Sequence, residues 1–203
     1  MKITKLFILS ILAVLFAGCS QFSAPAIYSS KAMNELTTDL KKIGENYKIE
    51  KVRVYEKETL SNEFGMAIVE MRDSEGQKYE QSLYYNLSIP HDDPKPMKER
   101  GIKRQEPHAV NIDDIINQKD NIEKYVEEAK AQIDEEFESK CKFESVTFLT
   151  FTADNEGNLQ IQFTVNITEK GKSDRREGGR MVTDYYGLEF SVDNDGNVTY
   201  NGD

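Results

Sequence analysis

The sequence predicts an α+β fold of two similar αβββ units, each a helix followed by an antiparallel meander, with the helix packed on one sheet face. Three observations lead to this prediction. Apolar residues recur first at every third or fourth position, as in a helix with one buried face, and then at every second position, as in strands. Turn signals separate the alternating stretches. The order occurs twice, and a helix laid on a meander buries both apolar sets.

The first unit is expected over residues 31–89. Its helix is predicted by an apolar stripe formed by Met33, Leu36, Leu40, Ile43 and Tyr47. The strand-like runs that follow lie around 52–54, 64–71 and 79–89. Ser74, Glu75 and Gly76 supply a turn between the last two runs.

The second unit is expected over residues 111–203. Asn111 can cap its helix, with Asp113 and Asp114 in the first turn, where the helix dipole favours acidic groups. The stripe consists of Ile115, Ile122, Val126, Ala129, Ile133 and Phe137, with a bend expected near 120–121. The strands are expected at 141–153, 159–167 and 182–192, with a short last strand at 198–200. Residues 193–197 are expected to form a type I′ turn, since they lack the spacing of a calcium loop.

Residues 90–110 are interpreted as a proline-rich linker, because the stretch holds four of the five prolines and has no periodicity. His91, Asp92, Asp93 and His108 could in principle meet at a metal, but they lack the close spacing of a zinc site. A solvated loop is therefore the preferred interpretation, and no metal or other cofactor is expected.

The first eighteen residues are typical of a signal peptide. Lys2 and Lys5 precede an apolar run over 6–16. That run is shorter than the roughly 20 residues that span a bilayer as a helix. An uncleaved anchor is one alternative, and ordinary secretion with cleavage after Ala26 is another.

Leu15-Phe16-Ala17-Gly18-Cys19 resembles the lipobox of bacterial lipoproteins. The resemblance implies cleavage between Gly18 and Cys19 and a diacylglyceryl thioether on the Cys19 sulfur. The protein is then expected in the bacterial cell envelope, anchored by lipid on Cys19, in the outer membrane if the cell is Gram-negative. Residues 19–30 are interpreted as a flexible tether. Lipidation leaves Cys141 as the one other cysteine, expected to be a small buried hydrophobic residue.

The chain carries 26 basic and 36 acidic residues, a net charge of −10. Because phosphate binding needs a basic patch, nucleic acid is not expected as a partner. Lys172, Arg175, Arg176 and Arg180 could clamp an anion, but a charged hairpin tip is the preferred interpretation. The acidic residues over 123–138 are expected on the solvent side of the second helix.

The two successive αβββ units resemble the cystatin-like and PepSY-like modules of bacterial envelope proteins, including tandem proteins of the β-lactamase-inhibitor type. The closest local likeness, Tyr185-Tyr186-Gly187-Leu188-Glu189-Phe190-Ser191-Val192-Asp193-Asn194-Asp195-Gly196-Asn197-Val198, resembles the closing hairpin of a PepSY repeat. The resemblance implies protein binding or inhibition and no catalysis.

Two stretches, 145–153 and 158–168, carry no charge in a chain that is 31% charged. If the apolar residues of 159–167 face the helix, the polar ones form the opposite face with help from neighbouring strands. The residues of this expected interaction face are Phe148, Gln160, Gln162, Thr164, Asn166, Met181, Thr183 and Tyr185. Val146 and Thr150 are expected beside them. The alternative is an ordinary β surface, since Thr is common in strands.

The sequence therefore favours a lipid-anchored envelope protein that binds a protein, a glycan or another envelope macromolecule without catalysis. A hydrolase acting on envelope material is one alternative, with acidic side chains as general acid and base. A structural or assembly subunit of an envelope complex is another.

Overall fold

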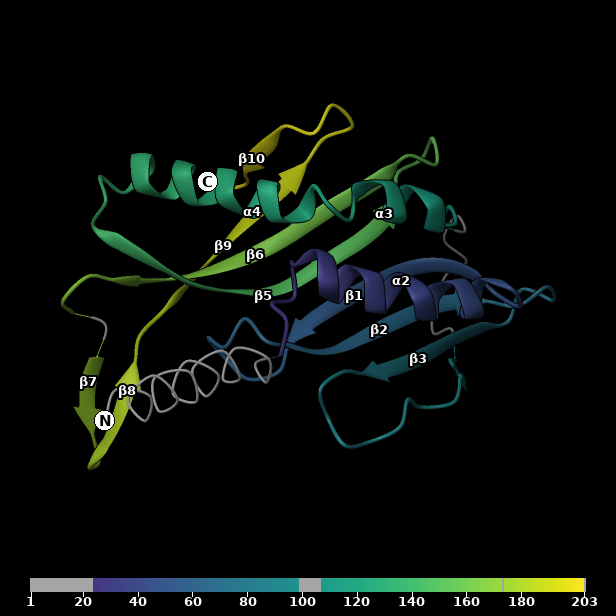
Figure 1. Cartoon of the computed structure of the whole chain (residues 1–203), viewed down its shortest axis with the longest axis horizontal. Coiled ribbons are helices and arrows are strands. Elements are labelled where there is room, and N and C mark those ends of the chain that lie inside the picture. Colours follow the sequence, from purple (N-terminus) through teal and green to yellow (C-terminus); the bar gives the residue numbers. More distant parts are fainter. Residues whose placement is uncertain (1–23, 99–106, 173, 203) are drawn as a thin grey trace, which may run out of the picture.

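The computed structural model describes residues 24–98, 107–172 and 174–202 (Figure 1). The expected signal peptide at 1–18 and the expected lipidation site Cys19 lie outside these residues, as does the 99–106 part of the expected linker. The described chain is α+β, as predicted, with an antiparallel sheet of eight strands.

The sheet is continuous and its strands follow the order β10-β9-β6-β5-β1-β2-β3-β4. Its long strands are β1 (Lys48–Glu56), β2 (Phe64–Arg72), β3 (Lys78–Tyr84), β5 (Cys141–Ala153), β6 (Leu159–Glu169) and β9 (Tyr186–Val192). Its edges are the short strands β4 (Lys95–Pro96) and β10 (Val198–Tyr200). Short edge strands present few unpaired backbone groups to other chains.

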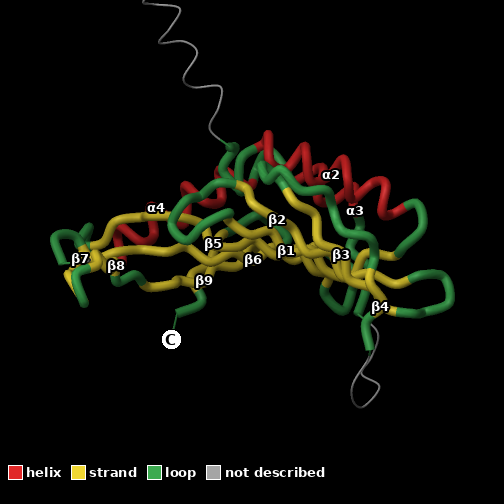
Figure 2. The backbone as a smooth tube through the Cα atoms, turned by 90° about the horizontal axis from the view of Figure 1, so that it is seen from below, coloured by secondary structure: helices red, strands yellow, loops and turns green. Residues whose placement is uncertain are grey.

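The described helices all lie on one face of the sheet, as the edge-on view in Figure 2 shows. They are α2 (Ser30–Gly44), α3 (Ile112–Gln118) and α4 (Ile122–Glu136). Asn111 caps α3 by accepting a hydrogen bond from the N–H of Asp113, with Asp113 and Asp114 in the first turn, as predicted. The helix predicted for the second half is interrupted between α3 and α4, where the bend was expected.

The core lies between these helices and the facing side of the sheet. The inward residues of the central strands alternate with outward ones, as Val52 and Val54 of β1 and Phe163 and Val165 of β6 illustrate. Cys141, the one cysteine among the described residues, is a free thiol half-buried against this core.

Strands β1 and β5 form the junction between the two halves of the chain and pair antiparallel. Arg53 stands opposite Thr150, and Tyr55 stands opposite Phe148. Strand β5 contains two bulges, between Phe143 and Ser145 and between Val146 and Phe148. A bulge shifts the side-chain alternation by one residue. Val146 is therefore fully buried opposite Val165, and its expected position beside Phe148 is wrong.

The strand predicted over 182–192 is two separate elements. Strand β9 begins at Tyr186, whereas Val182 belongs to a two-stranded ribbon of β7 (Asp174–Glu177) and β8 (Arg180–Thr183). Figure 1 shows this ribbon extending away from one end of the sheet. Cross-strand polar contacts hold it, including the 2.9 Å hydrogen bond from Thr183 Oγ1 to Asp174 Oδ1. Such contacts leave no apolar periodicity from which a strand could be predicted.

Segments outside the two predicted units also pack on the sheet. Ile27, in the expected tether, is fully buried, and Ala26 forms a β-bridge with Glu63. In the expected linker, β4 pairs with β3, and Val110 donates its N–H to the carbonyl of Ile49 at 2.7 Å. The packed body therefore extends beyond 31–89 and 111–203 into both of these segments.

Three tight turns share one chemistry, in which an Asp side chain accepts backbone N–H groups two and four residues later. These are Asp73, Asp154 and Asp193. In the last of them Gly196 has φ +85°, whereas Asp195 is not in a left-handed conformation. A type I′ turn needs positive φ at both central residues, so that expectation is wrong. The geometry is a type I turn followed by a glycine bulge.

Candidate functional site

The sheet face opposite the helices, called the open face below, has none of the described helices on it (Figure 2). The strand register places the side chains of directly paired residues beside one another on this face. One row runs from Ile68 through Arg53 and Thr150 to Gln162. The next row runs from Met66 through Tyr55, Phe148 and Thr164 to Glu189.

A hollow of about 350 Å³ lies on the open face across β1, β5, β6 and β9, and it is called the sheet hollow below. The side chains of the open face that line it are Lys51, Arg53, Tyr55, Phe148, Thr150, Gln162, Thr164 and Glu189. Thr150 and Thr164 are only 6% and 9% exposed. Because these short side chains stand between longer ones on adjacent strands, the surface is hollowed there.

Two aromatic side chains form one part of the wall. The ring centroids of Tyr55 and Phe148 lie 6.3 Å apart, with the rings inclined at 48°. Both side chains are half-buried, so each presents part of a ring to solvent. Aromatic groups of this kind are enriched where proteins bind one another.

Two cationic side chains, Lys51 and Arg53, line the hollow together with these rings. Arg53 donates from Nη2 to Glu70 Oε1 at 3.1 Å, but its Nε is buried and has no hydrogen-bond acceptor among the described residues. Buried donors without an acceptor are rare in folded proteins. Burial alone would raise the pKa of Glu70, but the hydrogen bond and charge of Lys78, with Arg53 and Lys51, lower it below its usual range.

Glu189 is the one carboxylate among the residues that line the sheet hollow. General acid–base hydrolysis of the kind considered above uses two carboxylates close together, and this lining does not supply that pair.

Of the interaction face expected from the sequence, Phe148, Gln162 and Thr164 lie together in the hollow. Gln160 is on the same face, half-buried opposite Thr152. Asn166 shares this face but is buried and donates to Ser145 Oγ at 3.3 Å.

The remaining three expected residues lie elsewhere. Met181 and Thr183 are on the β7–β8 ribbon, and Tyr185 is exposed between β8 and β9. Their expected place on a strand beside β6 is therefore wrong, because that strand starts only at Tyr186.

The residues missed by sequence reasoning come mostly from the first half of the chain. Lys51, Arg53 and Tyr55 alternate with buried Val52 and Val54, so the sequence does indicate that they face away from the core. It does not indicate that β1 pairs with β5, and this pairing brings them beside Phe148.

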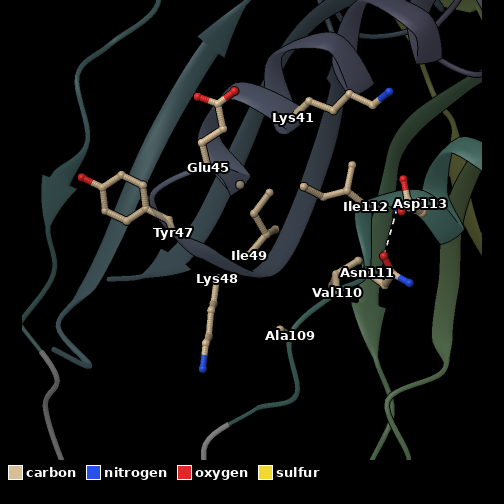
Figure 3. A pocket seen from close by; sticks show the side chains of 11 residues that line it. Lys41, Glu45, Tyr47, Lys48, Ile49, Ala109, Val110, Asn111, Ile112 and Asp113 are labelled. Atoms are coloured by element: carbon tan, nitrogen blue, oxygen red, sulfur yellow. Dashed lines mark hydrogen bonds between the residues drawn. The ribbon is translucent and has the colours of Figure 1, made fainter. Parts of the chain in front are cut away.

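A second hollow, of about 420 Å³, lies at the C-terminal end of α2 (Figure 3). Ile49, Val110 and Ile112 supply its apolar surface, whereas Tyr47 and Lys48 point away from Ile112 (Figure 3). The hydrogen bond drawn there, from the N–H of Asp113 to Asn111 Oδ1 at 3.1 Å, is the cap of α3. This Asn111–Asp113 pair therefore serves the start of α3.

His91 is held by protein groups on both ring nitrogens. Its Nδ1 accepts the N–H of Tyr84 at 3.0 Å, and its Nε2 lies 3.2 Å from Asp39 Oδ2. His108 is exposed at a different part of the chain. Within the described residues, no group of three His, Cys, Asp or Glu side chains is placed to hold a metal ion.

The basic residues near Gly178 and Gly179 have acidic neighbours. Lys172 pairs with Glu169 at 2.7 Å, and Arg175 pairs with Asp184 at 2.8 Å. This pairing within the ribbon and its base favours the hairpin-tip interpretation over an anion clamp.

None of the described helices is long and apolar enough to cross a membrane. No family model, no curated protein and no solved structure matches the chain.

Proposed function

We propose that this chain is a lipid-anchored protein of the bacterial cell envelope that binds another macromolecule through the sheet hollow and does not act on it chemically. The anchor is supported by the lipobox-like sequence ending at Cys19. Two or three acyl chains hold a soluble domain on a membrane, because each buried methylene contributes about 0.8 kcal/mol.

The observation that carries the binding proposal is the sheet hollow itself. Aromatic, amide, hydroxyl and cationic side chains converge there from four strands. The lining of mixed polar and aromatic side chains is typical of a site that recognises part of a partner.

We propose further that the sheet consists of two αβββ units joined side by side. In this interpretation α2 with β1–β3 forms one unit, and α4 with β5, β6 and β9 forms the other. The antiparallel β1–β5 pair is the seam between them. The hollow then belongs to both units, since β1 and β5 each supply part of its wall.

Site-specific photocrosslinking in native membranes tests the binding proposal. A photoreactive amino acid at Gln162, which is exposed in the hollow, is expected to yield a discrete adduct. The matched control is the same amino acid at Ala131, which is exposed on α4 on the opposite side of the sheet.

Adduct formation at Gln162 should also fall when Phe148→Ala removes the aromatic wall. Equal adducts at both positions, or no adduct at Gln162, would contradict the proposal.

A further inference from the structure

The cationic side chains that line the sheet hollow have fewer partners within the protein than the other charged side chains of the open face. Arg72, Lys78 and Glu70, on β2 and β3, form ion pairs that include Glu50 of β1. Arg72 pairs with Glu50, and Lys78 Nζ lies 2.6 Å from Glu70 Oε2 and 3.7 Å from Glu50 Oε2. These four side chains are ion-paired with one another within the sheet, although Glu50 Oε2 is buried without a hydrogen-bond partner.

The cations that line the hollow are less fully engaged. Lys51 forms no ion pair or hydrogen bond with another described side chain, and Arg53 retains an unsatisfied Nε. Both come from β1, on adjacent outward positions two residues apart. The ring of Tyr55 follows at the next outward position on the same strand.

The charge of the hollow is opposite to that of the whole chain. Two cations and one carboxylate line it, whereas the protein carries a net charge of −10. A partner group with a single negative charge complements this lining. Doubly charged phosphate fits less well, because Glu189 stands on the far wall and would repel it.

The aromatic wall selects among singly charged groups. The rings of Tyr55 and Phe148 are inclined to each other by 48° and do not form one flat platform. An apolar side chain fits between inclined rings, whereas a sugar ring stacks best on a flat one. Gln162 and Thr150 nearby can donate and accept hydrogen bonds, as a peptide backbone requires.

We propose that the sheet hollow binds an acidic peptide segment of a partner protein. Its carboxylate lies at Lys51 and at the exposed part of the Arg53 side chain, and a neighbouring apolar side chain lies against Tyr55 and Phe148. This inference rests on the proposed function of the same face and adds the chemical class of the ligand.

The test uses the full chain in detergent micelles and two pools of capped hexapeptides. One pool has the pattern Xaa-Xaa-Glu-Phe-Xaa-Xaa, and the other replaces Glu by Gln. Titration is followed by NMR, with the Nε–H resonance of Arg53 as a reporter of changes around its guanidinium group. The Glu pool is expected to shift this resonance and to bind at least tenfold more tightly than the Gln pool.

Three variants locate the contact. Lys51→Gln and Arg53→Gln should each weaken binding of the Glu pool by at least tenfold. Lys124→Gln makes the same charge change on the exposed side of α4 and should leave it unchanged. Lys51→Gln keeps the test decisive if Arg53→Gln disturbs the ion pair with Glu70.

Equal affinity for the Glu and Gln pools would overturn the inference, as would unchanged binding by Lys51→Gln. Binding of polygalacturonate in place of the peptides would also overturn it and would assign the hollow to an acidic glycan. These results can be separated from failure of the proposed function, because the crosslink at Gln162 reports a partner of any chemistry.

Discussion

The side-chain oxygen of Asn62 accepts a hydrogen bond from the backbone N–H of Val146 at 2.8 Å. The amide nitrogen of the same residue donates to the carbonyl of Glu144, also at 2.8 Å. Asn62 therefore satisfies backbone groups at the bulged part of β5 after the β1–β5 pairing has ended at Tyr55 and Phe148. One side chain thus continues the junction beyond its last backbone pair.

Asn62→Gly is expected to lower the free energy of unfolding by about 1–3 kcal/mol, because it leaves buried backbone groups without partners. Glycine keeps the positive φ of 59° found at this position, so the change introduces no backbone strain, and the entropy that glycine loses on folding adds to the loss of the amide. Urea unfolding measures the difference. Asn155→Ala at an exposed turn is the control and should be nearly neutral; equal losses in both variants would contradict the assignment.

Gly65→Ala should destabilise the protein by about 1–3 kcal/mol through overpacking. A Cβ at this position would overlap the backbone of Lys57, which cannot move without disturbing the β1–β2 connection. Thermal unfolding measures the loss. Gly187→Ala is the matched control, because its Cβ would meet side-chain atoms alone, the Thr164 methyl group at 3.3 Å and Asn166 Oδ1 at 3.9 Å. The interpretation fails if the control loses as much stability as Gly65→Ala.

Gln162→Arg should change the free energy of unfolding by no more than about 0.5 kcal/mol, since the side chain is exposed. Thr164→Arg should cost clearly more, because Thr164 is only 9% exposed and packs beside Gly187. Chemical denaturation of the two variants compares neighbouring positions of one strand face. If Thr164→Arg left the free energy of unfolding unchanged, the prediction would be wrong, and the floor of the sheet hollow would accommodate a long charged side chain.

Stability is expected to fall above about pH 10, partly through Tyr85. Burial, and then the neighbouring Asp39 carboxylate, raise the pKa of Tyr85 above its ordinary value. The folded state therefore keeps this proton where the unfolded state has lost it, and folding is opposed as pH rises through the unfolded-state pKa.

Tyr85→Phe removes this proton and should flatten the alkaline loss, although it also removes the 3.1 Å hydrogen bond to Asp39 at every pH. Unfolding free energies at about pH 8 and about pH 11 give the slope. Tyr186→Phe, at an exposed position, should retain the wild-type slope. An unchanged slope in Tyr85→Phe would contradict the expected role.

Cys19→Ser should release the protein into the soluble fraction or leave the uncleaved precursor, because the expected lipid has no other attachment site. Metabolic labelling with a fatty acid measures the modification. Cys141→Ser serves as the control and should label like the wild type. Equal labelling of Cys19→Ser would contradict the anchor.

Local patterns predicted the elements well where burial was periodic. The stripe from Met33 to Ile43 became α2, and the alternation of β6 placed Phe163 and Val165 inward. Even the interruption between α3 and α4 was visible in the sequence. These features depend on residues close together in the chain.

The features that sequence reasoning missed depend on long-range pairing or on polar contacts. The bulges of β5 turn the Val146 side chain toward the core and away from the open face. The residues next to Val146 in the sequence do not indicate these bulges. The β7–β8 ribbon contains no buried stripe, so it was assigned in part to β9. Half of the hollow was missed because Arg53 and Thr150 become neighbours only through the β1–β5 pairing.

The same pairing has a consequence for how the newly made chain reaches its folded state. Tyr55 and Phe148 stand opposite each other although about ninety residues separate them, and contacts of such long sequence separation form late and slowly. Until β5 is in place, β1 is an open edge that can pair with another chain. Substitutions that delay the arrival of β5 should therefore increase aggregation during biogenesis while leaving the mature protein as stable as before.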